Sequence, residues 1–238
     1  MEFNGWEKLS LVDFDGNLTT TVFSSGCPFR CPFCHNADLV LHPNALPVIP
    51  FEEILAYLKK RRGILEGVCI SGGEPTIGGN DLLVKMSLIK ELGYKIKLDS
   101  NGCNPSLLKE AVSKGLVDFI AMDIKNSKAK YPQTIGLKNF DLAPIEESVA
   151  FLLSNQIPYE FRTTLIDEFH TEEDILEIKQ WIKGANRYFL QCYIDSENCI
   201  EHGFHPVSFE KAKHFVALLE DSFGKVALRG YEDPNEAK

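Results

Sequence analysis

The sequence predicts an α/β fold, a partial (β/α)6-type parallel barrel, from three observations. Segments typical of strands alternate with segments typical of helices from Thr19 to Arg229. Repeated strand-then-helix units favour a parallel sheet with right-handed crossovers. The chain of 238 residues carries about six or seven such units, which is fewer than the eight of a complete barrel.

The expected strands are rich in β-branched, aromatic and aliphatic residues, and several end in glycine or polar turn residues. The first strand, Thr19–Ser24, runs directly into a cysteine-rich loop. The third ends at the turn Asn101-Gly102. Expected strands after the first cover the ranges 68–71, 95–100, 118–123, 159–166, 187–194 and 226–229.

The expected helices carry apolar residues on one face or have recognisable ends. Pro50 opens the first of them, and a capping box of Thr171 and Asp174 opens a later one. The stretch 132–144 is expected to be a loop. Helices are expected over the ranges 50–62, 81–92, 105–114, 145–155, 171–183 and 208–223.

Length and charge set limits on the organisation of the chain and on its partners. We expect one domain over 1–238, with a lead-in segment at 1–18, a β/α core at 19–231 and a tail at 232–238. The formal net charge of −9 argues against nucleic-acid binding, which needs a basic face. The sequence shows neither a signal-peptide pattern nor an apolar run of about 18 residues. We therefore expect a cytoplasmic protein with no nucleic-acid or membrane partner.

Three cysteines follow the first expected strand with the spacing Cys-x3-Cys-x2-Cys, namely Cys27, Cys31 and Cys34. In a reducing compartment such a group indicates a metal site rather than disulfides. Three thiolates on one short loop can hold a cubic iron–sulfur cluster, whose four irons commonly take four cysteines. One iron would then stay open for a substrate, as in catalytic metal sites.

A structural zinc site and inert buried cysteines are the alternatives to a cluster. Structural zinc takes four ligands, typically from two Cys-x2-Cys pairs. This loop has one such pair, and His35 lies too close to Cys34 in sequence to complete the site. Inert buried cysteines would not gather after a strand. The pattern therefore favours the iron–sulfur cluster.

Two short motifs follow the next expected strands, where parallel β/α folds gather their ligands. Ser71–Pro75 contains Gly72, Gly73 and Glu74, and its glycine carbonyls can accept from an ammonium group. Asp99–Gly102 contains Ser100 and Asn101, whose polar groups could bond ribose hydroxyls. Each motif alone is also typical of an ordinary turn.

Charged residues mark the fourth and fifth expected strands. Asp123 and Lys125 are two residues apart along a strand, so both would project the same way toward a ligand. A surface ion pair is the alternative. Arg162 lies among apolar and aromatic residues, where it pairs either with a carboxylate ligand or with a structural acid such as Glu160.

The cysteine motif, with aromatic Phe33 before its last cysteine, resembles that of the radical S-adenosylmethionine superfamily. The run Cys34-His35-Asn36 is similar to the glycyl-radical-enzyme activases. The lead-in Ser10–Gly16, followed by Phe23-x2-Gly26-Cys27, looks most like the activating proteins of anaerobic ribonucleoside-triphosphate reductase. The resemblance extends from about residue 5 to about residue 195. Asp15 departs from it, because proline is expected between the aromatic residue and glycine.

The resemblance implies a role for each motif residue. Cys27, Cys31 and Cys34 would ligate one [4Fe–4S] cluster, whose open iron would chelate the amino and carboxylate groups of S-adenosylmethionine. Asp99 and Asp123 match positions that help bind a monovalent cation in related activases. The implied contacts with S-adenosylmethionine are Phe33 near the adenine, Gly72, Gly73 and Glu74 at the methionyl ammonium, Ser100 and Asn101 at the ribose, and Lys125 and Arg162 near the carboxylate.

The implied reaction begins with one-electron reduction of the cluster by a donor such as flavodoxin or ferredoxin. Reductive cleavage of S-adenosylmethionine then gives methionine and a 5′-deoxyadenosyl radical. This radical would take a hydrogen atom from a glycine of a partner glycyl-radical enzyme, and anaerobic ribonucleotide reductase is the partner that we expect. The cluster and cofactor supply the difficult chemistry, while the protein binds, orients and excludes water.

Three other functions remain open. The chain could activate another glycyl-radical enzyme, such as pyruvate formate-lyase. A radical enzyme with a small-molecule substrate, such as a 7-carboxy-7-deazaguanine synthase, is disfavoured by the Cys34-His35-Asn36 run and by the Ser10–Asp13 lead-in. A metal-binding scaffold without catalysis would need none of the strand-end motifs.

The remaining cysteines and histidines match no recognised ligand pattern. Whether Cys192, Cys199, His202 and His205 bind anything is left open by the sequence. Relatives with additional ferredoxin-like clusters carry further close-spaced cysteine runs. Because this sequence has none, we expect a single cluster.

Overall fold

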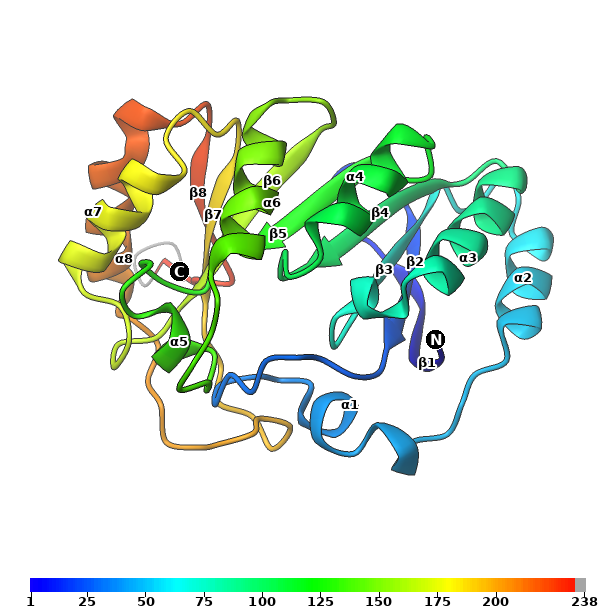
Figure 1. Ribbon diagram of the computed structural model, residues 1–238, viewed down its shortest axis with the longest axis horizontal. Coiled ribbons are helices and arrows are strands. Elements are labelled where there is room, and N and C mark those ends of the chain that lie inside the picture. Colours follow the sequence, from blue (N-terminus) through cyan, green and yellow to red (C-terminus); the bar gives the residue numbers. More distant parts are fainter. Residues whose placement is uncertain (234–238) are drawn as a thin grey trace. The chain divides into compact units, whose positions relative to one another are not determined.

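The computed structural model describes residues 1–233, and its strands follow one another in the sheet in chain order (Figure 1). β1 pairs antiparallel with β2, whereas β2 to β4 and β6 to β8 pair in parallel. The order has two ends, β1 and β8, so the sheet is open and the predicted α/β class of partial parallel barrel is confirmed. The strands are β1 (Phe3–Ser10), β2 (Thr19–Ser24), β3 (Gly67–Gly72), β4 (Lys95–Ser100), β5 (Phe119–Asp123), β6 (Tyr159–Leu165), β7 (Tyr188–Cys192) and β8 (Val226–Arg229).

Helices separate the parallel strands, and each expected helix is present. The capping box of Thr171 and Asp174 opens α7 as predicted. Two short helices, α1 and α5, were not expected, and α5 corrects the prediction that 132–144 is a loop throughout. The helices are α1 (Ala37–Leu41), α2 (Phe51–Lys60), α3 (Asn80–Glu91), α4 (Pro105–Ser113), α5 (Tyr131–Thr134), α6 (Ala143–Leu153), α7 (Glu172–Trp181) and α8 (Phe209–Leu219), with single 3-10 turns at Pro43–Ala45, Pro75–Gly78 and Glu220–Ser222.

The lead-in 1–18 contains β1, a strand that sequence reasoning missed. β1 stands at the end of the strand order, and most of its side chains are at least partly exposed. Its sequence therefore lacks the alternation of apolar and polar residues by which a half-buried strand is recognised. Trp6 attaches β1 to β2 by donating from Nε1 to Thr20 Oγ1 at 2.8 Å, and its ring meets Tyr57 edge-on.

The chain divides into two compact units. The first comprises 1–28, 36–121 and 144–158, and the second comprises 29–35, 122–143 and the residues from 159 onward. The expectation of one domain stays a prediction, and the expected tail 232–238 lies outside the described residues from position 234 on. No helix among residues 1–233 has the length and apolar character that crossing a bilayer requires.

In the first unit, helices α2 to α4 flank the strands β2 to β4 (Figure 1). Val22, Ile70 and Leu98 supply fully buried side chains from the three strands. Such aliphatic burial contributes about 1.5–3 kcal/mol for each side chain. Elsewhere in the first unit, Phe14 from the segment after β1 packs against Phe119, with the two ring centroids 5.7 Å apart. The second unit has β6 to β8 beside α7 and α8.

Candidate active site

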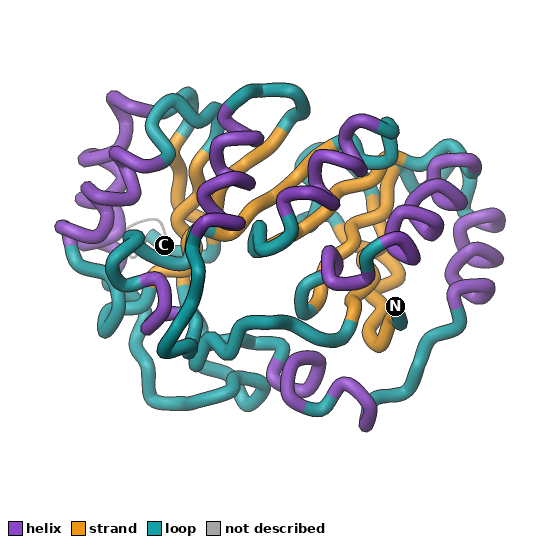
Figure 2. Tube along the Cα trace, in the orientation of Figure 1, coloured by secondary structure: helices purple, strands orange, loops and turns teal. Residues whose placement is uncertain are grey.

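The cysteine loop leaves β2 through a tight junction with the glycine turn Gly72–Glu74 of the first unit. Figure 2 shows the segment between β2 and α1 as a loop. At its start, the N–H of Gly73 donates to the carbonyl of Ser24 at 2.8 Å, and the N–H of Glu74 donates to the carbonyl of Gly26 at 2.8 Å. The end of β3 therefore fixes the backbone directly before Cys27.

The same turn also holds the far end of the loop. Asn36 donates from Nδ2 to the carbonyl of Gly72 at 2.9 Å. A Cβ on Gly73 would lie 2.1 Å from the carbonyl oxygen of Gly26, and one on Gly72, whose φ is +118°, would lie 2.4 Å from the carbonyl oxygen of Ser24. Only glycine fits these two positions. They serve backbone packing here, and their predicted contact with the methionyl ammonium stays a prediction.

Glu74 is fully buried and joins the ends of β3 and β4. Its Oε1 accepts from the N–H of Thr76 at 3.1 Å, from Thr76 Oγ1 at 2.6 Å and from Ser100 Oγ at 2.8 Å. Its Oε2 accepts from the N–H of Asn101 at 2.6 Å. Burial raises the pKa of Glu74, while these donors act in the opposite direction. This structural role could not be predicted from the sequence, because the donors come from two separate strand ends.

Asn101 directs its side-chain amide toward the first cysteine. Its Nδ2 donates to Cys27 Sγ at 3.6 Å, and its Oδ1 accepts from the N–H of Cys103 at 2.9 Å. Ser100 is held in turn, because its Oγ accepts from the N–H of Gly102 at 3.0 Å. Hydrogen bonds to sulfur are one means by which proteins tune iron–sulfur clusters. The predicted ribose contacts of Ser100 and Asn101 are not tested by this geometry.

In the second unit, Cys31 and Cys34 share one turn. The N–H of Cys34 donates to the carbonyl of Cys31 at 3.0 Å. The segment after β7 holds this turn, because Ile200 donates to the carbonyl of Cys34 at 3.2 Å and Glu201 donates to that of Pro32 at 2.7 Å. The last two cysteines are thus held in place by a backbone segment more than 160 residues away in sequence.

Tyr193 in the same segment packs on the side chains beside Cys34. Its ring stacks on His35 with centroids 5.5 Å apart and meets Phe33 edge-on at 6.5 Å. His35 Nε2 also lies 2.6 Å from the carbonyl oxygen of Ile194. Sequence reasoning missed Tyr193, whose only signal was an aromatic residue at the end of an expected strand. Phe33 is buried, and its predicted place by the adenine stays a prediction.

The thiol of Cys31 is buried, and charged groups nearby also act on it. Burial raises the pKa of Cys31 to about 12, and the ammonium of Lys125 acts in the opposite direction. A thiol with such a pKa keeps its proton at neutral pH unless a metal takes the proton's place. The surroundings of Cys31 therefore do not make it a reactive surface thiolate.

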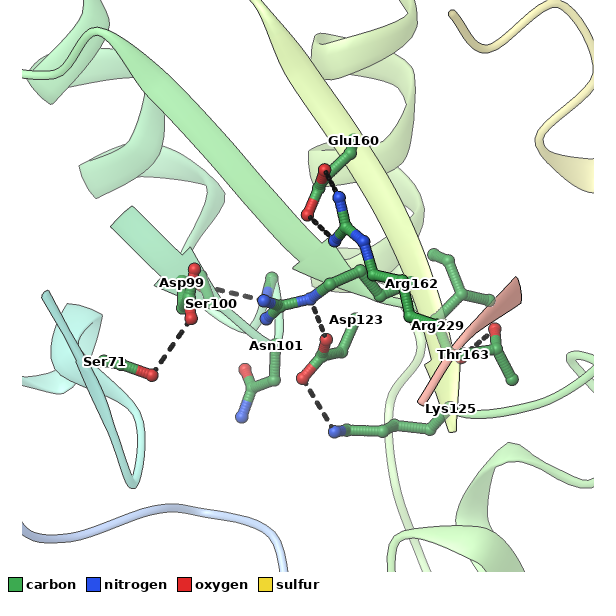
Figure 3. A network of polar contacts seen from close by, with 12 residues as sticks. Ser71, Asp99, Ser100, Asn101, Asp123, Lys125, Glu160, Arg162, Thr163 and Arg229 are labelled. Carbon is green, nitrogen blue, oxygen red and sulfur yellow. Dashed lines mark hydrogen bonds and ion pairs between the residues drawn. The ribbon is translucent and has the colours of Figure 1, made fainter. Parts of the chain in front are cut away.

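Asp123, Lys125 and Arg162 form one charged group in the second unit (Figure 3). Lys125 Nζ lies 2.9 Å from Asp123 Oδ2, and Arg162 Nε lies 2.9 Å from Asp123 Oδ1. Although burial opposes ionisation, the two cations lower the pKa of Asp123 to about 2. Burial likewise opposes the charge of Lys125, but Asp123 raises its pKa. Asp123 is thus held by two cationic side chains, and cationic side chains of this kind are also the usual partners of carboxylate ligands.

The structural acid named as a possible partner of Arg162 is engaged by another residue. Both oxygens of Glu160 accept from the guanidinium of Arg229 in β8, at 2.7 and 3.0 Å (Figure 3). Arg162 instead donates to Asp123. Arg162 thus pairs with an acid of the protein other than Glu160, and its predicted contact with the carboxylate of the cofactor stays a prediction.

The remaining cysteines and histidines have separate partners. Cys199 is buried and accepts from the hydroxyl of Tyr193 at 3.6 Å. His202 pairs with Asp195 and His205 with Glu168, both on the surface. In the part of the chain that the structure describes, no three His, Cys, Asp or Glu side chains are grouped to hold a metal ion, and the ligand role of Cys27, Cys31 and Cys34 therefore stays a prediction.

The buried His170 is expected to make the stability of the protein depend on pH. Its Nε2 faces the carbonyl of Lys125 at 3.0 Å, its Nδ1 accepts from the N–H of Ile166 at 3.1 Å, and burial lowers its pKa. The unfolded chain takes up a proton near pH 6.5 that the native chain resists. We therefore expect the free energy of unfolding in urea to fall as the pH is lowered from about 7.5 to 5.5.

A His170→Gln variant tests this expectation, since it should show a smaller loss of stability over the same pH range. His205→Gln is the matched control, because Glu168 raises the pKa of His205 and its contribution has the opposite sign. The loss should then be larger than in the wild type. A His170→Gln variant with the wild-type pH dependence would contradict the assignment.

The open, mostly parallel sheet, with a cysteine-rich loop at the carboxyl end of β2, defines an α/β protein of the partial-barrel type. The sequence model of the Radical SAM superfamily matches residues 21–182. The chain belongs to this superfamily, which confirms the family resemblance and the prediction of an enzyme that uses radical chemistry.

Two similar proteins are named as activating enzymes, and a structure with the same fold was solved with S-adenosylmethionine. A protein of Methanocaldococcus jannaschii named "putative glycyl-radical enzyme activating enzyme" is 28% identical over 231 residues, which are 95% of this chain and 91% of that protein. The pyruvate formate-lyase-activating enzyme of Listeria monocytogenes is 28% identical over 188 residues, 74% of each chain. Streptococcus suis SuiB, solved with S-adenosylmethionine, shares the fold with a TM-score of 0.65 at 14% identity. That match covers 87% of this chain and about half, 49%, of SuiB.

The superfamily implies a [4Fe–4S] cluster and S-adenosylmethionine, and the chemistry of the donor set fits both. The seven cysteines, all within the described residues, form no disulfide. An amide N–H faces Cys27 Sγ, and the ammonium of Lys125 is close enough to Cys31 to oppose the effect of burial on its pKa. Both groups favour a sulfur that carries negative charge. Lys125 and Arg162 supply cationic groups of the kind that binds carboxylates.

Proposed function

We propose that the chain is a glycyl-radical-enzyme activase that cleaves S-adenosylmethionine at a single [4Fe–4S] cluster. The observation that carries the proposal is the similarity to a named activating enzyme along nearly the whole of both chains. The cysteine loop supports it, because each residue of the Cys34-His35-Asn36 run has a defined contact. His35 meets Tyr193, and Asn36 closes the loop onto Gly72.

The cluster and S-adenosylmethionine, when bound, supply reductive cleavage to a 5′-deoxyadenosyl radical, and the chain supplies binding and orientation. In this proposal Cys27, Cys31 and Cys34 hold the cluster. Lys125 and Arg162 bind the methionyl carboxylate through their cationic groups. The other proposed contacts are the glycine turn at the ammonium, Phe33 at the adenine, and Ser100 and Asn101 at the ribose.

Anaerobic ribonucleoside-triphosphate reductase is the partner that we propose, on the strength of the Ser10–Gly16 segment. In the structure this segment has defined contacts: Asp13 accepts from Thr21 Oγ1 at 2.5 Å and Phe14 packs on Phe119. Pyruvate formate-lyase is the second candidate, favoured by the Listeria relative. Flavodoxin or ferredoxin is the proposed electron donor. The proposed setting is the reducing cytoplasm, where thiolates persist.

Two measurements test the proposal in sequence. First, the anaerobically reconstituted and reduced protein should convert S-adenosylmethionine to 5′-deoxyadenosine. Second, with a purified partner present, electron paramagnetic resonance should show a glycyl radical on ribonucleotide reductase but not on pyruvate formate-lyase. A radical on pyruvate formate-lyase alone would select the second candidate. Cofactor cleavage without a radical on either enzyme would contradict both partner assignments and leave the radical chemistry intact.

A further inference from the structure

Lys97 of β4 has a buried ammonium group to which the proposed function gives no role. The residue is only 5% exposed, although lysine is almost never buried without a partner. In the sheet register Lys97 stands opposite Cys69 of β3, which stands opposite Thr21 of β2. Residues paired in this way face the same side of a sheet. The three side chains therefore form one layer across the first unit.

The next layer toward the carboxyl ends of the strands contains Asp99, two residues beyond Lys97. Asp99 Oδ2 accepts from Ser71 Oγ at 3.1 Å, as Figure 3 shows. The ammonium of Lys97 lies 3.1 Å from the other oxygen, Asp99 Oδ1. Lys97 thus reaches from its own layer to the carboxylate that directly precedes Ser100 and Asn101.

The opposite side of the Lys97 ammonium is held by the segment after β1. Lys97 Nζ donates to the backbone carbonyl of Asp13 at 2.5 Å, and the carboxylate of Asp13 accepts from Thr21 Oγ1. Ser10 Oγ accepts from the N–H of Asp13 at 3.2 Å, which fixes this segment locally. Lys97 is therefore anchored on one side and directed at Asp99 on the other.

The family resemblance implied a monovalent cation at Asp99 and Asp123, and the residues present do not fit one. A bound alkali-type cation needs several oxygen ligands in place of water. Asp99 already faces the ammonium of Lys97, and Asp123 faces two cations, Lys125 and Arg162. An added cation at either carboxylate would meet a like charge at about 3–4 Å, which is repulsive.

We propose that Lys97 is a built-in counter-cation for Asp99, a positioning residue that holds this carboxylate and makes the chain independent of added sodium or potassium. The inference deepens the proposed function and rests on it, because Asp99 precedes the proposed ribose contacts. The ammonium of Lys97 neutralises Asp99, and the Asp13 carbonyl keeps the ammonium in place. Activity and stability then depend on ionic strength alone, and not on which monovalent cation is present.

The test compares sodium, potassium and N-methylglucamine chlorides at one ionic strength, using the protein without cluster or cofactor. The melting temperature of the wild type should be the same in all three salts. Lys97→Ala should melt at a lower temperature, and sodium or potassium should restore part of the loss while the large organic cation should not. Lys97→Gln, which keeps a donor toward Asp13, should show the same cation dependence if Lys97→Ala does not fold.

Lys95→Ala is the matched control, since Lys95 is an exposed lysine of the same strand bound to Asn17 Oδ1. It should show no cation dependence. The cluster-loaded Lys97→Gln variant should bind S-adenosylmethionine about tenfold more weakly in N-methylglucamine and recover in sodium. Adding Asp99→Asn to Lys97→Gln should abolish the cation response.

Two outcomes would overturn the proposal. One is a wild type whose melting temperature differs between small and large cations. The other is a folded Lys97 variant that responds equally to all three salts. Neither outcome involves cluster, cofactor or partner, so the failure of this inference is distinguishable from the failure of the proposed function.

Discussion

Replacing Cys31 with alanine is expected to remove the cluster and, with it, all formation of 5′-deoxyadenosine. A cluster with one open iron has three protein ligands, so the loss of one of the three proposed thiolates leaves too few to hold it. Iron content after anaerobic reconstitution should fall from about four atoms per chain to a small residual. Iron and sulfide analysis, followed by quantification of 5′-deoxyadenosine, measures both effects.

Cys69→Ala is the matched control for this loss. Cys69 is a fully buried cysteine of β3, so its removal takes away a sulfur and leaves a small void in the same protein. Its iron content and cofactor cleavage should remain at the wild-type level, with a loss of stability of about 1 kcal/mol. Cofactor cleavage by Cys31→Ala, or equal loss of iron in both variants, would remove Cys31 from the ligand set.

The sequence predicts the strands of this fold well wherever local chemistry decides them. β2, β4 and β8 have the expected bounds, because apolar or β-branched runs there end at recognisable turns. β1 was missed because its pairing with β2, and not an alternation in its own residues, makes it a strand. The single turn of α5 is shorter than any pattern with a period of 3.6 residues can reveal.

In the candidate site too, features formed by residues close in sequence could be predicted, whereas contacts between distant segments could not. The three cysteines could be found because they are adjacent in sequence, and their spacing alone indicates one loop. Tyr193 could not be found, because nothing in the sequence shows that it stacks on His35. The pairing of Arg162 with Asp123 rather than with Glu160 could not be found either, because Arg229, which binds Glu160, is 69 residues away in sequence.

Glu74→Ala is expected to lower the free energy of unfolding by about 3 kcal/mol, because it leaves buried donors without acceptors. The donors are the backbone N–H groups of Thr76 and Asn101 and the hydroxyls of Thr76 and Ser100. Urea denaturation of the protein without cluster measures the change. The contact of Glu74 with the methionyl ammonium that the resemblance implies stays a prediction.

Glu74→Gln separates the structural role of Glu74 from its predicted cofactor role. The amide keeps the volume and one acceptor oxygen, but it turns an NH2 group toward one of the donors, so the loss of stability should be about half that of alanine. For Glu74→Ala, an unfolding free energy within about 0.5 kcal/mol of the wild type would contradict the role of Glu74 in joining β3 to β4.

Cofactor affinity is the second measurement on Glu74→Gln. If the folded Glu74→Gln variant loads its cluster but binds S-adenosylmethionine weakly, the carboxylate also acts on the cofactor. If cofactor affinity is unchanged, the glycine turn binds the ammonium through its backbone, and Glu74 acts only by holding Ser100 and Asn101 in place.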